Sequence, residues 1–102
     1  MWAILHNEYI RRNSVIGRDI EELSDVNVVS VYSDVNDAIS ALDTMYNMIP
    51  EVIGNTMKKD QCTYHKTNDM SFQVQCEYDT YLSTHICCIK WVQSNAYVKQ
   101  NN

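Results

Sequence analysis

The clearest pattern along the chain is an apolar stripe with helical period between residues 34 and 49. The positions that follow steps of three and four are Val35, Ala38, Ile39, Leu42, Met45, Tyr46 and Ile49. This spacing predicts an amphipathic helix whose apolar side lies against a sheet. Ser33 is expected to cap the helix, and Asp34 and Asp37 favour the positive end of its dipole. Pro50 is expected to end it, because proline cannot donate the next helical hydrogen bond.

Other segments have the composition of β-strands. Residues 2–10 are rich in aromatic and branched side chains, and residues 26–32 are apolar at nearly every position. The second segment is therefore expected to be an interior strand, buried on both faces. Residues 70–79 alternate between apolar and polar side chains, as in a half-exposed antiparallel strand, and residues 85–92 are apolar on both faces. These last two segments are expected to pair as a hairpin through a turn at 79–84.

The remaining segments lack a sustained pattern. Residues 11–17 have the composition of a turn, and residues 18–25 are locally helical but have few apolar anchors, so at most one or two helical turns are expected. Residues 51–69 predict a long loop. Because an unstructured connection of that length is uncommon in a compact domain, it either has a function or contains an element that the pattern does not reveal. The polar residues 95–102 predict a frayed tail.

Together these elements predict a single α+β domain of the ββαββ type over residues 1–102. Its sheet is expected to be mainly antiparallel, with about four strands and one main helix packed on one face. The edges of such a sheet need a cover, and a second copy of the chain is the simplest one. We therefore expect a homodimer.

Charge and composition limit the kinds of molecule that the chain is expected to bind. The chain has 13 acidic and 8 basic side chains and a formal net charge of -5, so it repels phosphate backbones and is not expected to bind nucleic acid directly. No apolar run approaches the roughly 20 residues that cross a bilayer, so no membrane association is expected. The first residues lack the basic start and the cleavage site of a signal peptide, which predicts a cytoplasmic protein.

Cysteine and histidine side chains are the candidate metal ligands in the sequence. Cys62, His65, His85 and Cys87 supply enough donors for a tetrahedral zinc site, but they lack the paired cysteine spacing and the turn glycine of zinc modules. A packing role is therefore favoured, and no metal or other cofactor is expected. Cys88 adjoins Cys87 and would point to the opposite face of a strand, which disfavours a disulfide framework.

No catalytic motif is present in the sequence. The chain contains only two glycines and none of the glycine-rich loops that bind phosphate. Thiols and imidazoles are available, but no motif of a thiol enzyme surrounds them. The chain is therefore not expected to be an enzyme.

The short length, the bias toward Asn, Asp and Tyr, and a strand followed by VYSDVNDAISAL resemble small accessory proteins of bacteriophages and other mobile elements. The resemblance covers residues 26–48. It implies a protein that binds and blocks a host enzyme, such as a defence nuclease.

These observations favour a non-enzymatic protein-binding module, namely a phage-encoded inhibitor of a host or defence-system protein. The residues expected at its contact surface are Glu21, Glu22, Asp25, Tyr64, Tyr81, Arg11 and Arg12. The first alternative is a protein that binds or sequesters a nucleotide signal in a pocket between two protomers, formed by Arg11, Arg12 and residues 51–69. The second alternative is a zinc-binding protein or a small enzyme.

Overall fold

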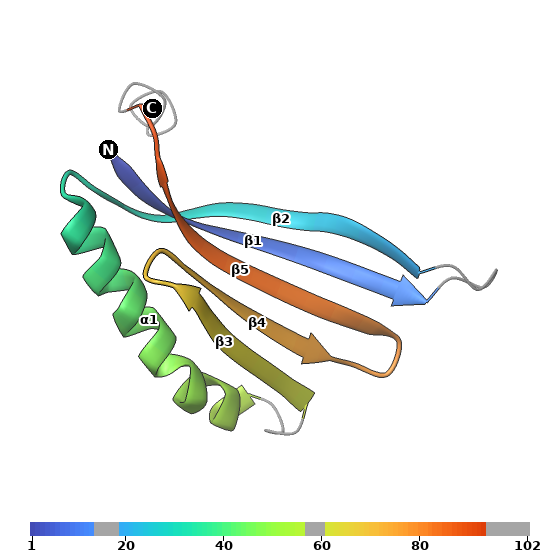
Figure 1. The fold of residues 1–102 in the computed structure, drawn as a ribbon. Coiled ribbons are helices and arrows are strands. Elements are labelled where there is room, and N and C mark those ends of the chain that lie inside the picture. Colours follow the sequence, from blue (N-terminus) through green and yellow to red (C-terminus); the bar gives the residue numbers. More distant parts are fainter. Residues whose placement is uncertain (14–18, 57–60, 94–102) are drawn as a thin grey trace.

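The computed structural model of the chain describes residues 1–13, 19–56 and 61–93, and contains one helix and a five-stranded antiparallel sheet (Figure 1). The elements are β1 (Trp2–Asn13), β2 (Asp19–Tyr32), α1 (Val35–Thr56), β3 (Cys62–Asn68), β4 (Ser71–Glu77) and β5 (Tyr81–Trp91). The strands lie in the order β2-β1-β5-β4-β3, and each neighbouring pair is antiparallel. The α+β class is confirmed, with five strands in place of the expected four or so.

The core lies between α1 and one face of the sheet. Ala38 and Leu42 of the helix have no exposed surface, and Ile49 is buried about two helical turns beyond Leu42. They pack with Ile4 of β1 and Phe72 of β4, in a cluster that also holds buried residues of β3 and β5. The apolar stripe predicted from the helical period is thus confirmed as the buried side of the helix.

Both ends of α1 differ from the prediction. Asp34 is the residue that caps the helix, because its Oδ1 accepts a hydrogen bond from the backbone N–H of Asn36 at 2.7 Å. Pro50 does not end the helix, which continues to Thr56. Proline removes one helical hydrogen bond, to the carbonyl of Tyr46, but leaves the donors of the following residues in place. No helix among the described residues is long and apolar enough to cross a membrane.

The second strand is where the prediction was most in error. The short helix expected at 18–25 does not form, because β2 begins at Asp19 and pairs with β1 along its whole length. The interior strand expected at 26–32 is the second half of β2, which lies at an edge of the sheet and is exposed from Val26 to Val29. Pairing with β1 therefore overrides the weak local helical preference.

The long loop expected at 51–69 is also wrong for most of its length. Residues 51–56 belong to α1, and residues 62–68 form β3, the element that the pattern did not reveal. The hairpin expected from the last two strands is confirmed, since Phe72 of β4 pairs with Cys87 of β5. The turn predicted at 11–17 is wrong for residues 11–13, which belong to β1. Residues 14–17 of that turn and the predicted tail at 95–102 lie outside the described residues.

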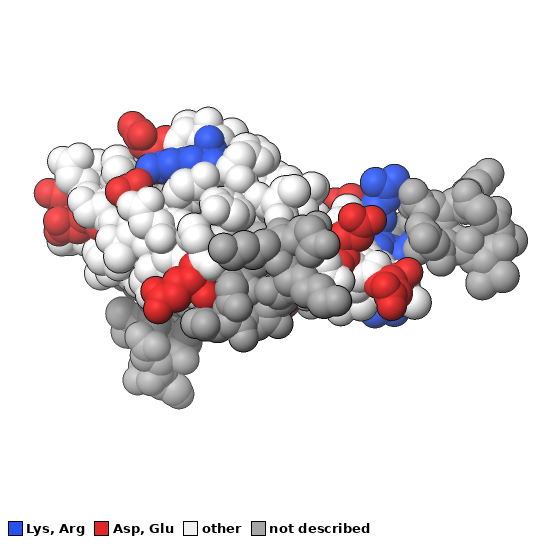
Figure 2. All heavy atoms as spheres, turned by 90° about the horizontal axis from the view of Figure 1, so that it is seen from below, with Lys and Arg blue, Asp and Glu red and all other residues white. Residues whose placement is uncertain are grey.

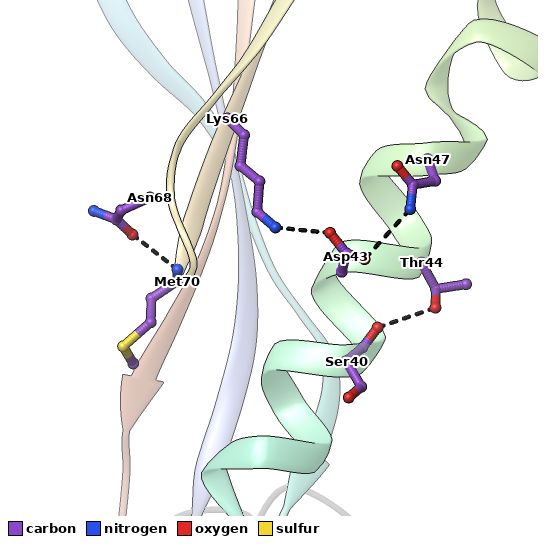
Figure 3. Close-up of polar contacts among 7 residues, drawn as sticks. All are labelled: Ser40, Asp43, Thr44, Asn47, Lys66, Asn68 and Met70. Carbon is purple, nitrogen blue, oxygen red and sulfur yellow. Dashed lines mark hydrogen bonds and ion pairs between the residues drawn. The ribbon is translucent and has the colours of Figure 1, made fainter.

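Polar contacts hold the outer side of the helix to β3 and close the neighbouring turn (Figure 3). Lys66 of β3 donates a hydrogen bond and forms an ion pair to Asp43 of α1 at 2.7 Å. The hydrogen bond to Lys66 lowers the pKa of Asp43 below its ordinary value. In the turn between β3 and β4, the N–H of Met70 donates to Oδ1 of Asn68 at 2.8 Å. The Lys66–Asp43 ion pair thus links the exposed side of α1 to β3.

The helix covers only one face of the sheet, and no other described element lies over the opposite face (Figure 1). Residues that face each other across an antiparallel pair point to the same side, so the register assigns the side chains to the two faces. We call the side opposite α1 the helix-free face. Its residues from the middle of β1 and β2 are Leu5, Asn7, Tyr9, Leu23, Val26 and Val28.

Candidate functional site

Most of the predicted contact residues gather at one end of the sheet. Arg11 lies opposite Glu21 in the register of β1 and β2, and Arg12 lies opposite Tyr81 in the register of β1 and β5. Glu22 is one residue further along β2 from Glu21, on the other face. Basic and acidic side chains therefore alternate at this end, and Figure 2 shows red and blue side chains side by side there.

Asp25 and Tyr64 stand apart from that group. Asp25 lies nearer the middle of β2, opposite Glu8. Tyr64 is on β3, at the other edge of the sheet, where its ring packs edge-on against Tyr46 with centroids 5.9 Å apart. The predicted residues therefore do not form one surface, because three strands, β4, β5 and β1, lie between Tyr64 on β3 and the residues on β2.

The most exposed part of the sheet is β2. Every side chain from Glu21 to Val29 is exposed. The apolar ones among them have exposed fractions of 54% for Leu23, 52% for Val26, 38% for Val28 and 48% for Val29. Since large apolar side chains are seldom exposed in a row on a monomer, β2 is a candidate contact surface. Sequence reasoning missed these residues, because branched side chains have the same strand preference at an edge as in the centre.

A network of two histidines and a serine lies on the side of the sheet that faces α1. Nε2 of His6 is 2.8 Å from Nδ1 of His85, and Nε2 of His85 is 3.0 Å from Oγ of Ser83. The two imidazole rings stack with centroids 5.1 Å apart. Ser83 is only 3% exposed, so its hydroxyl is out of reach of a substrate. The network satisfies polar groups within the sheet, and it gives no support for a serine nucleophile.

Burial of His85 predicts a pH-dependent stability. Burial lowers the pKa of His85 below its ordinary value of 6.5, His6 lowers it further, and Glu8 opposes both. Below about pH 6.5 the unfolded chain therefore takes up this proton more readily than the folded chain does. We expect the free energy of unfolding in urea to be smaller at pH 5 than at pH 7.5.

Substitution of His85 measures how much this residue contributes to the pH dependence of the free energy of unfolding. His85→Gln keeps a polar side chain and removes the titration, so the difference between the two pH values should shrink. His65→Gln, at an exposed position on β3, is the matched control and should behave as the parent. An unchanged pH dependence in His85→Gln would assign the effect to other groups.

The four cysteines form no disulfide bond, and in the described structure they do not assemble the zinc site considered from the sequence. Sγ of Cys62 and Sγ of Cys76 lie 3.1 Å apart across β3 and β4. Burial raises the pKa of Cys76 to about 12 and that of Cys87 to about 11, which keeps both thiols protonated. No three His, Cys, Asp or Glu side chains in the described part of the chain are placed to hold a metal ion.

The residues expected to bind the nucleotide phosphates lie apart within one chain. Arg11 and Arg12 are consecutive in β1 and point to opposite faces of the sheet. The segment expected beside them contributes β3, which is separated from β1 by β5 and β4. Within one chain, these arginines and β3 therefore lie apart, and a pocket that combines them has to be shared between two protomers, as expected from the sequence.

No family model matches the chain, and neither a curated protein nor a solved structure matches it. The resemblance to phage-encoded accessory proteins thus rests on residues 26–48 alone.

Proposed function

We propose that the protein is a non-enzymatic binding module that recruits an extended, basic segment of a partner protein to the outer edge of β2. One observation carries the proposal: β2 is an edge strand of 14 residues whose side chains from Glu21 to Val29 are all exposed. An edge strand presents unpaired backbone donors and acceptors to solvent. Addition of a further strand to such an edge is a recurring mode of peptide recognition.

The backbone of β2 supports this mode of binding. The backbone N–H of Val26 donates a hydrogen bond to Oδ1 of Asp25 at 3.0 Å. Asp25 also accepts a hydrogen bond from the side chain of Asn27 at 2.7 Å. An exposed carboxylate on an edge strand hinders the pairing of two identical edges and can be engaged by a basic side chain. Asp25 therefore favours a basic partner strand over another acidic one.

Charge supports the same preference. Glu22 and Asp25 are exposed on the side of β2 that faces α1, and Glu8 of β1 lies opposite Asp25. These three carboxylates, two on β2 and one on β1, lie on the α1 side of the sheet close to the β2 edge. They attract lysine or arginine at alternate positions of an added strand. The resemblance of residues 26–48 supports, as the biological partner, a host or defence protein that the module would inhibit in the cytoplasm.

The proposal is tested with a defined probe, a labelled peptide of alternating lysine and valine. Amide NMR signals of residues 21–29 should shift on addition of the peptide, and a peptide of alternating glutamate and valine should have no effect. The double variant Glu22→Lys with Asp25→Lys should weaken binding about tenfold, since each reversed charge costs about 0.7 kcal/mol in an exposed pair.

The matched control reverses two exposed carboxylates away from β2, Asp69→Lys with Asp79→Lys, and so has the same net charge. It should bind the lysine peptide as the parent does. Peptide-induced shifts confined to another element, or equal loss of affinity in both double variants, would rule out the β2 edge as the binding site. Capture of the full-length partner from host lysate would then follow with the same pair of variants.

A further inference from the structure

We propose that the helix-free face of the sheet is covered by a second copy of the chain, which makes the protein a face-to-face homodimer. This interface is separate from the β2 edge of the proposed function, because it uses the opposite side of the sheet. The central row of the face consists of Val26, Asn7 and Ile86 on three neighbouring strands, and the next row holds Val28 and Leu5. None of these side chains is ionised at any ordinary pH, so the centre of the face is uncharged.

The exposed apolar surface is the first argument that a second copy packs on the helix-free face. Val26 and Leu23 are 52% and 54% exposed, and Tyr9 lies between Leu23 and Thr84 in the third row. Contiguous apolar surface across several strands marks an interaction surface, in contrast to single exposed apolar residues. The neighbouring strand β4 continues the face with neutral polar residues, including Gln73 opposite Ile86. An apolar centre with a polar border is the usual composition of a protein interface.

The size of the face favours a folded domain over a peptide. Strands about 4.8 Å apart that rise about 3.3 Å per residue give this sheet a face of roughly 700 to 800 Å². A stable interface takes about 800 Å² from each partner. A second copy offers a face of the same area and composition, and two antiparallel sheets pack at about 10 Å with their inner faces in contact.

Charge at the ends of the face selects the arrangement of the two copies. Lys90, opposite Ala3, is at one end, whereas Arg11, Glu21 and Glu77 are at the other and sum to one negative charge. A twofold axis in the plane of the interface and perpendicular to the strands places each Lys90 over the acidic end of the other copy. It also places β2 over β2, so that apolar rows meet. An axis parallel to the strands would bring the two Lys90 residues of the central strand β5 together and stack apolar β2 on polar β3.

Asn7 provides an independent reason for a cover. It stands in the central row, and its Oδ1 is buried with no hydrogen-bond partner within the described chain. A buried acceptor without a donor is unfavourable. Near the proposed axis, the two Asn7 amides of the dimer can pair after rotation about the terminal torsion. One polar pair at the centre of an apolar interface also fixes its register.

The matched pair Val26→Lys and Met48→Lys tests the proposal, because both side chains are 52% exposed and the charge change is the same. The parent is expected to sediment at twice the mass of one chain. Val26→Lys buries two unpaired ammonium groups in the interface, so it should raise the dissociation constant of the dimer at least about 100-fold and sediment as a monomer. Met48→Lys, on the exposed side of α1, should remain a dimer.

A parent protein that is monomeric at about 100 µM would overturn the proposal, and so would a Val26→Lys variant that dimerises as tightly as the parent. Circular dichroism and a thermal melt of Val26→Lys are the folding controls, so that loss of the dimer is distinguished from unfolding. The lysine peptide is bound at the β2 edge in either oligomeric state. Failure of dimerisation and failure of peptide binding are therefore separate results.

Discussion

Leu42→Asp is expected to abolish the cooperative unfolding transition of the protein. Leu42 is fully buried at the centre of the contact between α1 and the sheet. Truncation of a buried leucine alone costs about 2 to 5 kcal/mol, and a carboxylate without a partner in an apolar core adds several more. Domains of this size have about 5 to 15 kcal/mol of stability in total. Thermal melts followed by circular dichroism should show no sigmoidal transition and weak near-ultraviolet signals.

The matched control for this experiment is Met48→Asp. Met48 lies on the same helix, and its side chain is 52% exposed, so the new carboxylate stays in water. We expect its free energy of unfolding to lie within about 1 kcal/mol of the parent, as for most surface substitutions. A Leu42→Asp protein that melted as late and as cooperatively as Met48→Asp would mean that α1 does not pack on the sheet through this stripe.

Phe72→Ala is expected to produce the second largest loss of stability. Phe72 of β4 is 3% exposed, and its ring packs against Tyr46 of α1 with centroids 5.6 Å apart. Removal of a buried phenylalanine side chain costs about 3 to 5 kcal/mol, through lost burial and the cavity that remains. The midpoint of thermal unfolding should fall by roughly 15 to 30 °C, at about 4 to 8 °C per kcal/mol for a domain of this length.

Tyr64→Ala separates burial from aromatic contact in the same region. Tyr64 also packs on Tyr46, at 5.9 Å, but its side chain is 39% exposed. We expect a loss of only about 1 kcal/mol, close to the value of one aromatic contact beyond its buried area. If the two variants lost equal stability in urea titrations, the core would not be centred on Phe72.

The two proposals assign different roles to the two sides of one strand. Glu22 and Asp25 project on the α1 side of β2 and select a basic partner segment, whereas Val26 and Val28 project from the helix-free face and meet a second copy. With the favoured axis, both β2 edges lie on the same side of the dimer. A partner with two basic segments would then bind more tightly than one with a single segment, because the second contact is intramolecular.

The elements that depend only on the local spacing of apolar residues could be predicted from the sequence. The helical stripe centred on Leu42 and the alternation of Phe72 and Cys76 in β4 follow from backbone periods of 3.6 and 2 residues, which one sequence displays directly. The same holds for Cys87 and Cys88, whose adjacency on a strand places them on opposite faces. The side chains that the periods placed inside were found buried, namely Leu42, Phe72 and Cys76, whereas only the structure shows that Cys87 is the buried member of the adjacent cysteine pair.

What tertiary structure alone decided is which strands lie side by side. Residues 26–29 have the composition of a central strand, yet β2 is an edge, because strand order depends on pairing between segments far apart in the chain. The contact of His6 with His85 joins residues 79 positions apart, and no local pattern reports it. By itself the sequence determined the helix, the alternating strand and the α+β class, since these follow from steric and hydrophobic periods. The helix-free face and the β2 edge exist only in the assembled sheet. Which side chains they expose depends on which strands and faces have no neighbouring element.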